Sequence, residues 1–217
     1  TAAGAKALGV DVVTGFMGSP IWAWWYSFPP TTEQQIADGY GKIVELWSPI
    51  FDEFDANGVT FALEVHPGEI AYDLYTMQRL IKEFGGRKTI GVNFDPSHLI
   101  WQGVQPHLFY RDLADRIYHV HMKDSKVTLD GRASILGSHL PFGDLKRGWN
   151  FVSMGHGSID FDAIMREINA AGYTGPLSIE WEDNGMSRDF GAPEALAFVQ
   201  KINFGASDIA FDGSMEK

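Results

Sequence analysis

Hydrophobic and polar positions along the chain follow two periods, and these periods alternate from one end to the other. Short runs of β-branched and other apolar residues are typical of strands that are buried on both faces. Longer stretches with apolar residues three and four positions apart are typical of amphipathic helices. We predict strands over residues 10–17, 59–65, 89–95, 116–124 and 176–182.

A helix is predicted after each of these strands, with boundaries marked by capping residues. Thr, Asp and Pro are favoured where helices begin, and Gly is favoured just after they end because it adopts positive φ readily. The opening residues TAAGAKALGV are typical of the last turns of a helix that leads into a strand. The later helices are predicted after Thr31 or Thr32, over 73–84 with Gly85–Gly86 at its end, near 107–115, from Asp160 to Gly172, and around 193–203, opened by Pro193.

Strands that alternate with helices predict a parallel sheet with right-handed crossovers, and therefore an α/β fold. Five such units do not close a barrel, which needs eight. We therefore predict a (β/α)₈ TIM barrel of which this chain holds about the last five βα units, with roughly three units missing ahead of Thr1. The competing interpretation is an open doubly wound sheet, but TGFMGSP after the first strand matches its Gly-rich phosphate turn poorly.

The chain shows no linker and no repeat beyond the βα unit, so we predict a single barrel domain over residues 1–204. Within it, residues 125–157 form a Gly-rich connection that is longer than a simple loop between two elements of a compact domain. We interpret this segment as an insertion at the active site. The polar and acidic residues 205–217 are expected to form a loose C-terminal tail.

Composition and charge limit the classes of partner that this domain is expected to bind. The net charge of −11 would repel phosphate backbones, so we expect no nucleic-acid partner. The longest apolar runs are short and interrupted, so we expect no membrane partner either. The absence of cysteine excludes disulfides and thiolate metal sites, and it is compatible with the reducing cytoplasm, where we expect the protein to reside.

Acid and imidazole groups end four of the predicted strands. Strand alternation directs these side chains to one side of the sheet, at the rim where barrel active sites lie. Buried carboxylates without partners cost several kcal/mol each, so one divalent cation among them is favoured over a network of salt bridges. The oxygen-rich set suits Mn²⁺ best, with Mg²⁺ or Co²⁺ as alternatives and Zn²⁺ less well suited. The predicted ligands are Glu64, Asp95, His121 and Glu180.

Further polar and aromatic residues near the same rim are candidates for substrate contact. His66 and Glu69 follow Glu64, and the alternative role for both is stabilisation of the loop. Lys123 shares a strand face with His121 and suits a hydroxyl or carboxylate of the substrate. In the stretch WAWWYSFPP, Trp22 and Trp24 predict a stacking platform for a sugar, with a subunit interface as the alternative.

Five short motifs occur in order at the predicted strand ends: LEVHP at 63–67, FDPSH at 94–98, HVHMKD at 119–124, GHGSID at 155–160 and SIEWE at 178–182. With these motifs the chain resembles the xylose-isomerase-like sugar isomerase and epimerase superfamily over roughly residues 10–203. This superfamily includes ketose 3-epimerases, inosose dehydratase and metal-dependent apurinic endonucleases. The resemblance implies the same four metal ligands. It further implies that the catalytic residues Glu64 and Glu180 exchange protons with the substrate, and that His98 contacts a substrate oxygen.

These residues suit chemistry on a carbohydrate. When a 1,2-hydroxycarbonyl is chelated by the cation, the C–H next to the carbonyl becomes acidic. The cation also stabilises the enediolate that deprotonation leaves. We predict a metal-dependent isomerase or epimerase of a sugar, cyclitol or keto-glycoside, with a lyase using the same proton abstraction as the alternative. An apurinic endonuclease-like phosphodiesterase and a non-catalytic partner subunit are less favoured. We expect a homo-oligomer, whose barrel is completed by a missing N-terminal segment or by a second chain.

Overall fold

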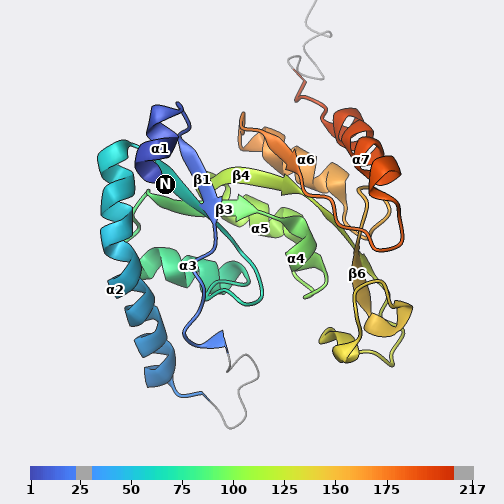
Figure 1. The fold of residues 1–217 in the computed structure, drawn as a ribbon, viewed down its shortest axis with the longest axis horizontal. Coiled ribbons are helices and arrows are strands. Elements are labelled where there is room, and N and C mark those ends of the chain that lie inside the picture. Colours follow the sequence, from blue (N-terminus) through green and yellow to red (C-terminus); the bar gives the residue numbers. More distant parts are fainter. Residues whose placement is uncertain (23–30, 208–217) are drawn as a thin grey trace, which may run out of the picture.

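A computed structural model describes residues 1–22 and 31–207 of the chain. Its centre is a parallel sheet of five strands in the order β1-β2-β3-β4-β7, curled with helices around it as in part of a TIM-barrel wall (Figure 1). This arrangement confirms the predicted fold class. The strands are β1 (Val12–Gly15), β2 (Thr60–Glu64), β3 (Ile90–Phe94), β4 (Ile117–Met122) and β7 (Leu177–Ile179).

Helices follow the strands along the chain, as the alternating periods predict. Within the described residues they are α1 (Ala2–Ala7), α2 (Glu33–Asn57), α3 (Leu74–Glu83), α4 (Pro96–Ile100), α5 (Pro106–Asp112), α6 (Phe161–Ala170) and α7 (Arg188–Ile202).

The helix ends follow from local side-chain chemistry. The Thr32 hydroxyl accepts a hydrogen bond from the backbone N–H of Gln35, and the Gln35 side chain accepts one from the backbone N–H of Thr32. This capping box starts α2 and confirms Thr32 as its N-cap. Asp160 caps α6 in the predicted way, accepting a hydrogen bond from the backbone N–H of Ala163.

The prediction that Pro193 opens the last helix is wrong. Helix α7 begins at Arg188, and Pro193 lies inside it. Pro193 has no backbone N–H, so the helix lacks one backbone hydrogen bond near its start. The first turn is held in another way, because the backbone N–H of Gly191 donates to the Ser187 carbonyl at 2.8 Å. A Cβ on Gly191 would lie 2.7 Å from the Trp181 indole, so this close packing requires glycine.

Other boundaries also differ from the prediction. The strand predicted over 176–182 has only three residues, although the backbone N–H of Glu180 still donates to the Met122 carbonyl of β4. The helix predicted near 107–115 ends at Asp112, and a 3₁₀ turn, η2 (Ala114–Arg116), follows it. The short helix α4 was not predicted, because five residues are too few to establish a period.

The insertion contains an antiparallel hairpin. Strand β5 (Asp124–Val127) begins directly after Lys123 and pairs with β6 (Trp149–Val152). Two 3₁₀ turns, η3 (Gly137–His139) and η4 (Leu145–Arg147), lie between the strands. The hairpin therefore returns the chain to the end of β4, at the rim where the candidate site lies.

The apolar core lies between the sheet and the helices. Phe51 of α2, Phe61 of β2 and Phe84, just after α3, meet with ring centroids 5.0 to 5.9 Å apart. Burying an aromatic or aliphatic side chain of this size contributes about 1.5–3 kcal/mol. Among the described residues, no helix is long and apolar enough to cross a membrane. Residues 208–217 of the predicted tail lie outside the described part of the chain.

Candidate metal centre

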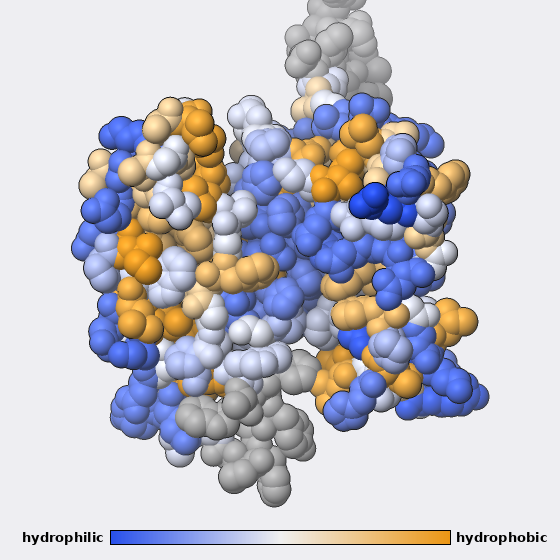
Figure 2. Space-filling model, in the orientation of Figure 1, coloured by the Kyte–Doolittle hydropathy of each residue, from blue (hydrophilic) through white to orange (hydrophobic). Residues whose placement is uncertain are grey.

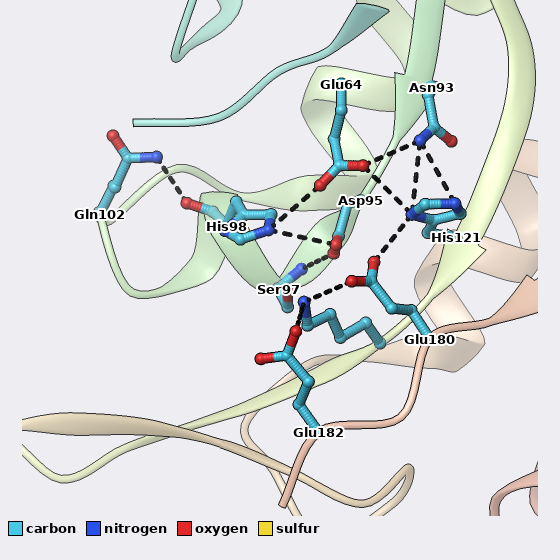
Figure 3. A network of polar contacts seen from close by, with 10 residues as sticks. Glu64, Asn93, Asp95, Ser97, His98, Gln102, His121, Glu180 and Glu182 are labelled. Atoms are coloured by element: carbon cyan, nitrogen blue, oxygen red, sulfur yellow. Dashed lines mark hydrogen bonds and ion pairs between the residues drawn. The ribbon is translucent and has the colours of Figure 1, made fainter. Parts of the chain in front are cut away.

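The ends of four neighbouring strands bring the four predicted ligand residues together (Figure 3). A ligand atom from each of the four residues lies within 4.8 Å of the others. Parallel strands end on one edge of the sheet, and alternation turns every second side chain inward. Glu64 ends β2, Asp95 follows β3, His121 lies in β4 and Glu180 follows β7.

Hydrophilic residues gather in the middle of the molecular face drawn in Figure 2. Apolar areas flank them, over α1 and α2 on one side and near α6 and α7 on the other (Figures 1 and 2). Several of the polar side chains of the site are nevertheless buried, with that of Glu64 8% and that of Asp95 0% exposed. Charged groups with so little access to water require partners.

Glu64 has polar partners on both carboxylate oxygens. Oε1 lies 3.3 Å from Nε2 of His98, and Oε2 accepts a hydrogen bond of 3.1 Å from the side-chain amide of Asn93. Oε2 also lies 3.4 Å from Nδ1 of His121. Burial raises the pKa of Glu64, but the hydrogen bonds to His121 and His98 outweigh it and hold the pKa well below its usual range. Glu64 is therefore a charged carboxylate in this site.

Asp95 supplies a direct test of whether a cation fits. Its Oδ1 accepts a hydrogen bond of 2.8 Å from the backbone N–H of Ser97, which caps α4. Its Oδ2 is buried and has no hydrogen-bond partner within the described chain; Nε2 of His98 lies 3.4 Å away. Burial raises the pKa of Asp95. An inward carboxylate oxygen without a hydrogen bond, beside two other carboxylates, fits a divalent cation.

His121 lies between two of the carboxylates of the site. Its Nδ1 lies 3.0 Å from Oε2 of Glu180 and 3.4 Å from Oε2 of Glu64. Burial lowers the pKa of His121, but these two carboxylates raise it to about 9. The carboxylates that raise this pKa would also attract a metal ion, and binding of the metal to this imidazole would displace its proton.

Lys123 is a buried cation next to this group. Its side chain is 3% exposed, and Nζ lies 3.1 Å from Oε1 of Glu180 and 3.1 Å from Oε1 of Glu182. Hydrogen bonding to His121 lowers the pKa of Glu180 most, and Lys123 lowers it further. The predicted substrate residue Lys123 is therefore in contact with a predicted ligand.

His98 and His66, two more of the predicted substrate residues, lie together at the site. Their ring centroids are 4.2 Å apart, with the rings edge to face. Burial and the charge of His98 lower the pKa of His66 to about 4, so His66 is neutral at pH 7. His98 bridges Glu64 and Asp95 through Nε2. A neutral imidazole beside a bridging one can accept or donate a hydrogen bond to a bound hydroxyl.

Glu69, the next candidate, is engaged with the backbone. Its Oε2 accepts hydrogen bonds from the backbone N–H groups of Met17 at 2.7 Å and Gly18 at 2.6 Å. These contacts hold the segment that follows β1. They correspond to the alternative role of Glu69, which is stabilisation of the loop. Trp22 is 41% exposed, and Trp24 lies outside the described residues.

Two contributors to the site had no assigned role from the sequence. The Asn93 side chain donates to Glu64 and lies 3.3 Å from Nδ1 of His121. Its position two residues before Asp95, on the same strand face, is a signal that identifies it. Phe151 of the hairpin has its ring 4.3 Å from Nζ of Lys123 and 5.3 Å from the His98 ring. No spacing in the sequence predicts these contacts, because they depend on how the hairpin folds back.

Comparison with known families gives a match over nearly the whole described chain. The family described as "Xylose isomerase-like TIM barrel" matches residues 2–202. A Bacillus subtilis protein, "Uncharacterized protein YfiH", is 30% identical over 174 residues, which are 76% of this chain and 54% of that protein. An inosose dehydratase of Clostridium beijerinckii is 25% identical over 185 residues, which are 83% of this chain and 59% of the enzyme. The chain thus spans little more than half the length of these relatives.

Solved structures share the fold at low sequence identity. The probable 3-DHS dehydratase AsbF of Bacillus anthracis has a TM-score of 0.64 and 19% identity, covering 92% of this chain and 66% of that one. The 3-keto-D-glucoside 4-epimerase YcjR of Escherichia coli has a TM-score of 0.64 and 15% identity, covering 92% and 67%. The IOLI protein, solved with a zinc atom, has a TM-score of 0.62 and 20% identity, covering 93% and 64%.

Proposed function

The chain belongs to the xylose isomerase-like TIM barrel family, and from this premise we propose that it carries the metal site of a carbohydrate-converting enzyme. The reaction is isomerisation or epimerisation of a sugar, cyclitol or keto-glycoside by removal of a proton next to a carbonyl. The observation that carries the proposal is the convergence of four ligand atoms within 4.8 Å, one of them from the buried Asp95. The activity is that of the whole protein, since the chain spans 54% and 59% of two of its relatives.

The proposed ligands of one divalent cation are Glu64, Asp95, His121 and Glu180. When bound, the cation would supply positive charge that acidifies the C–H next to the carbonyl and stabilises the negative charge left on the two oxygens. Three carboxylates and one imidazole favour Mn²⁺, with Mg²⁺ and Co²⁺ as alternatives. The zinc atom of the IOLI protein makes Zn²⁺ a necessary comparison in any metal analysis.

Glu64 and Glu180 are the proposed proton-transfer residues. They stand at the ends of β2 and β7, which are separated in the sheet by β3 and β4. The Glu180 side chain is 35% exposed and accessible to a substrate, whereas that of Glu64 is 8% exposed. Two carboxylates that approach a substrate from different sides can remove a proton on one face and return one on the other. That sequence is epimerisation, and return at the neighbouring carbon is isomerisation.

The same residues suit binding of polar substrate groups. His98 and His66 offer imidazole nitrogens on the Glu64 side of the site, and Lys123 offers an ammonium group on the Glu180 side. We propose that the imidazoles contact hydroxyl or carbonyl oxygens, and that Lys123 contacts a hydroxyl or carboxylate.

A lyase is the second candidate, and specific relatives favour it. The matched relatives include inosose dehydratases, and the structural neighbours include a probable 3-DHS dehydratase. Elimination begins with the same proton removal, and it differs only in that a group on the next carbon then leaves. Product analysis therefore separates the two reactions, and proton exchange alone does not.

The experiment combines metal analysis with proton exchange. The purified protein is loaded with Mn²⁺ and incubated in deuterium oxide with ketoses and inososes, and deuterium uptake at the α-carbon is followed by NMR. We expect uptake in the unmodified protein, and loss of both uptake and bound Mn²⁺ in Glu180→Gln. Glu83→Gln on α3 is the matched control, because Glu83 is exposed and forms an ion pair with Arg79 away from the candidate ligands. If Glu180→Gln still binds Mn²⁺ and still exchanges the α-proton, the proposed mechanism is wrong.

A further inference from the structure

The insertion hairpin returns an aromatic residue to the end of β4. Strand β5 begins at Asp124, the residue after Lys123, and Ser125 of β5 pairs with Phe151 of β6. This antiparallel register places Phe151 across from the start of the hairpin, although it lies 26 residues after Ser125 in the chain. The ring of Phe151 therefore lies beside the Lys123 side chain.

The Lys123 ammonium has three close partners. Its Nζ lies 3.1 Å from Oε1 of Glu180, 3.1 Å from Oε1 of Glu182 and 4.3 Å from the centroid of the Phe151 ring. The negative face of an aromatic ring attracts a cation, and the attraction grows when water is excluded. The Lys123 side chain is 3% exposed, so the contact is a desolvated one.

The Phe151 ring is itself fixed by neighbours. Phe142 stacks on it with centroids 5.5 Å apart and an interplanar angle of 18°, and Trp149 meets it at 5.3 Å and 73°. The His98 ring contacts it edge to face at 5.3 Å. With these contacts the ring cannot turn away from Lys123 without a change in the hairpin.

We propose that Phe151 is a positioning residue, whose ring fixes the Lys123 ammonium beside Glu180. A lysine side chain has four rotatable bonds, so two carboxylates alone leave it several arrangements. The Phe151 ring occupies the space toward the hairpin, so it excludes the Lys123 conformations that would point there. It also keeps water from the ammonium group. The insertion would then determine the position of the Lys123 ammonium next to Glu180. The consequence for turnover rests on the function proposed above, whereas the placement of Lys123 does not.

Chemical labelling tests the placement in the full chain. An amine-reactive acyl ester is applied, and acylation of Lys123 is measured by mass spectrometry relative to Lys126, an exposed lysine of the same hairpin. In Phe151→Leu, which keeps apolar bulk and removes the ring, we expect Lys123 to react faster by on the order of tenfold. In Phe151→Tyr, which keeps the ring, the rate stays at that of the unmodified protein.

A matched control separates the ring from the hairpin as a whole. Phe142→Leu removes only one neighbour of the Phe151 ring and leaves that ring beside Lys123, so we expect it to raise the labelling of Lys123 much less than Phe151→Leu does. If Phe142→Leu has the same effect as Phe151→Leu, or if Leu and Tyr at position 151 behave alike, Phe151 does not position Lys123. Circular dichroism checks folding of each variant, and Phe151→Met replaces Phe151→Leu if the latter does not fold.

Proton exchange supplies the functional readout. We expect kcat for α-proton exchange to fall by on the order of tenfold in Phe151→Leu with little change in KM, and to recover in Phe151→Tyr. An unchanged kcat in Phe151→Leu would show that Phe151 does not affect proton transfer by Glu180, the proposed base. Absence of exchange in the unmodified protein overturns the proposed function instead, and labelling then decides the role of Phe151 alone.

Discussion

Nζ of Lys123 lies 3.1 Å from Oε1 of Glu180, so a buried positive charge already contacts the carboxylate that we propose as metal ligand and base. The contact has two opposite effects. The ammonium competes with a metal ion for the negative charge of Glu180, and at the same time it fixes the carboxylate for proton transfer. Metal affinity and turnover should therefore respond in opposite directions when Lys123 is replaced.

Lys123→Met is expected to bind Mn²⁺ more tightly and to turn over more slowly. Removal of a buried positive charge next to a divalent cation should lower the Kd for Mn²⁺ by roughly tenfold. Loss of the group that orients Glu180 should reduce the rate of α-proton exchange by roughly 10–100-fold. Titration calorimetry and exchange into deuterium oxide measure the two quantities. Lys88→Met is the control, because Lys88 pairs with Asp115 at an exposed position. Weaker Mn²⁺ binding by Lys123→Met would contradict this account.

Asp124→Asn is expected to loosen the return of the insertion. Asp124 is 1% exposed, and its carboxylate accepts hydrogen bonds from the backbone N–H groups of Ser125, Gly155 and Gly157 at 2.8 to 3.0 Å. An amide in its place directs N–H at N–H, so we expect a loss of about 2–4 kcal/mol in the free energy of unfolding. Urea unfolding measures the loss, and hydrogen exchange over residues 153–159 locates it. Asp130→Asn, exposed in the same insertion, should change neither.

The positions of the strands and the candidate ligands could be predicted because both depend on short-range periods. Alternation along one strand decides which side chains face inward, and parallel strands share one edge. Glu64, Asp95, His121 and Glu180 therefore converge without any knowledge of the packing between helices. The capping chemistry at Thr32 is equally local.

The features that were missed depend on the chain folding back or on a local rule being overridden. The contact of Phe151 with Lys123 arises only because β6 pairs with β5. Pro193 breaks the local rule for helix starts, and the hydrogen bond of Gly191 to Ser187 preserves the turn before it. The sequence does not decide the role of Glu69, because its partners are backbone N–H groups, which no side-chain pattern reveals.

Alkaline pH should destabilise the protein partly through Tyr40. Burial raises the pKa of Tyr40 from 10.0 to about 12, although nearby Arg79 lowers it in part. Because the folded pKa lies above the unfolded one, the contribution of Tyr40 to stability is complete below pH 10 and is lost as the pH rises toward 12. The shift corresponds to up to about 3 kcal/mol. Urea midpoints at pH 8, 10 and 11.5 should fall more steeply in the unmodified protein than in Tyr40→Phe. Equal slopes would exclude Tyr40 as a source.

Gly91→Ala is expected to damage both the sheet and the metal site. A Cβ on Gly91 would lie 2.3 Å from the Tyr118 ring and 2.5 Å from the Arg116 carbonyl oxygen. The ring can rotate, but the carbonyl belongs to the backbone just before β4, so β3 must shift or strain. We expect a loss of about 1–3 kcal/mol in the free energy of unfolding.

The same shift should weaken Mn²⁺ binding, because β3 carries Asn93 and leads directly into Asp95. Gly41→Ala in α2 is the control, since a Cβ there meets no atom within 4 Å, and alanine in a helix should add about 0.5–1 kcal/mol. Thermal unfolding and Mn²⁺ titration of both variants give the comparison. A Gly91→Ala protein that is as stable as Gly41→Ala would show that the close approach of β3 and β4 at this position does not constrain the sheet.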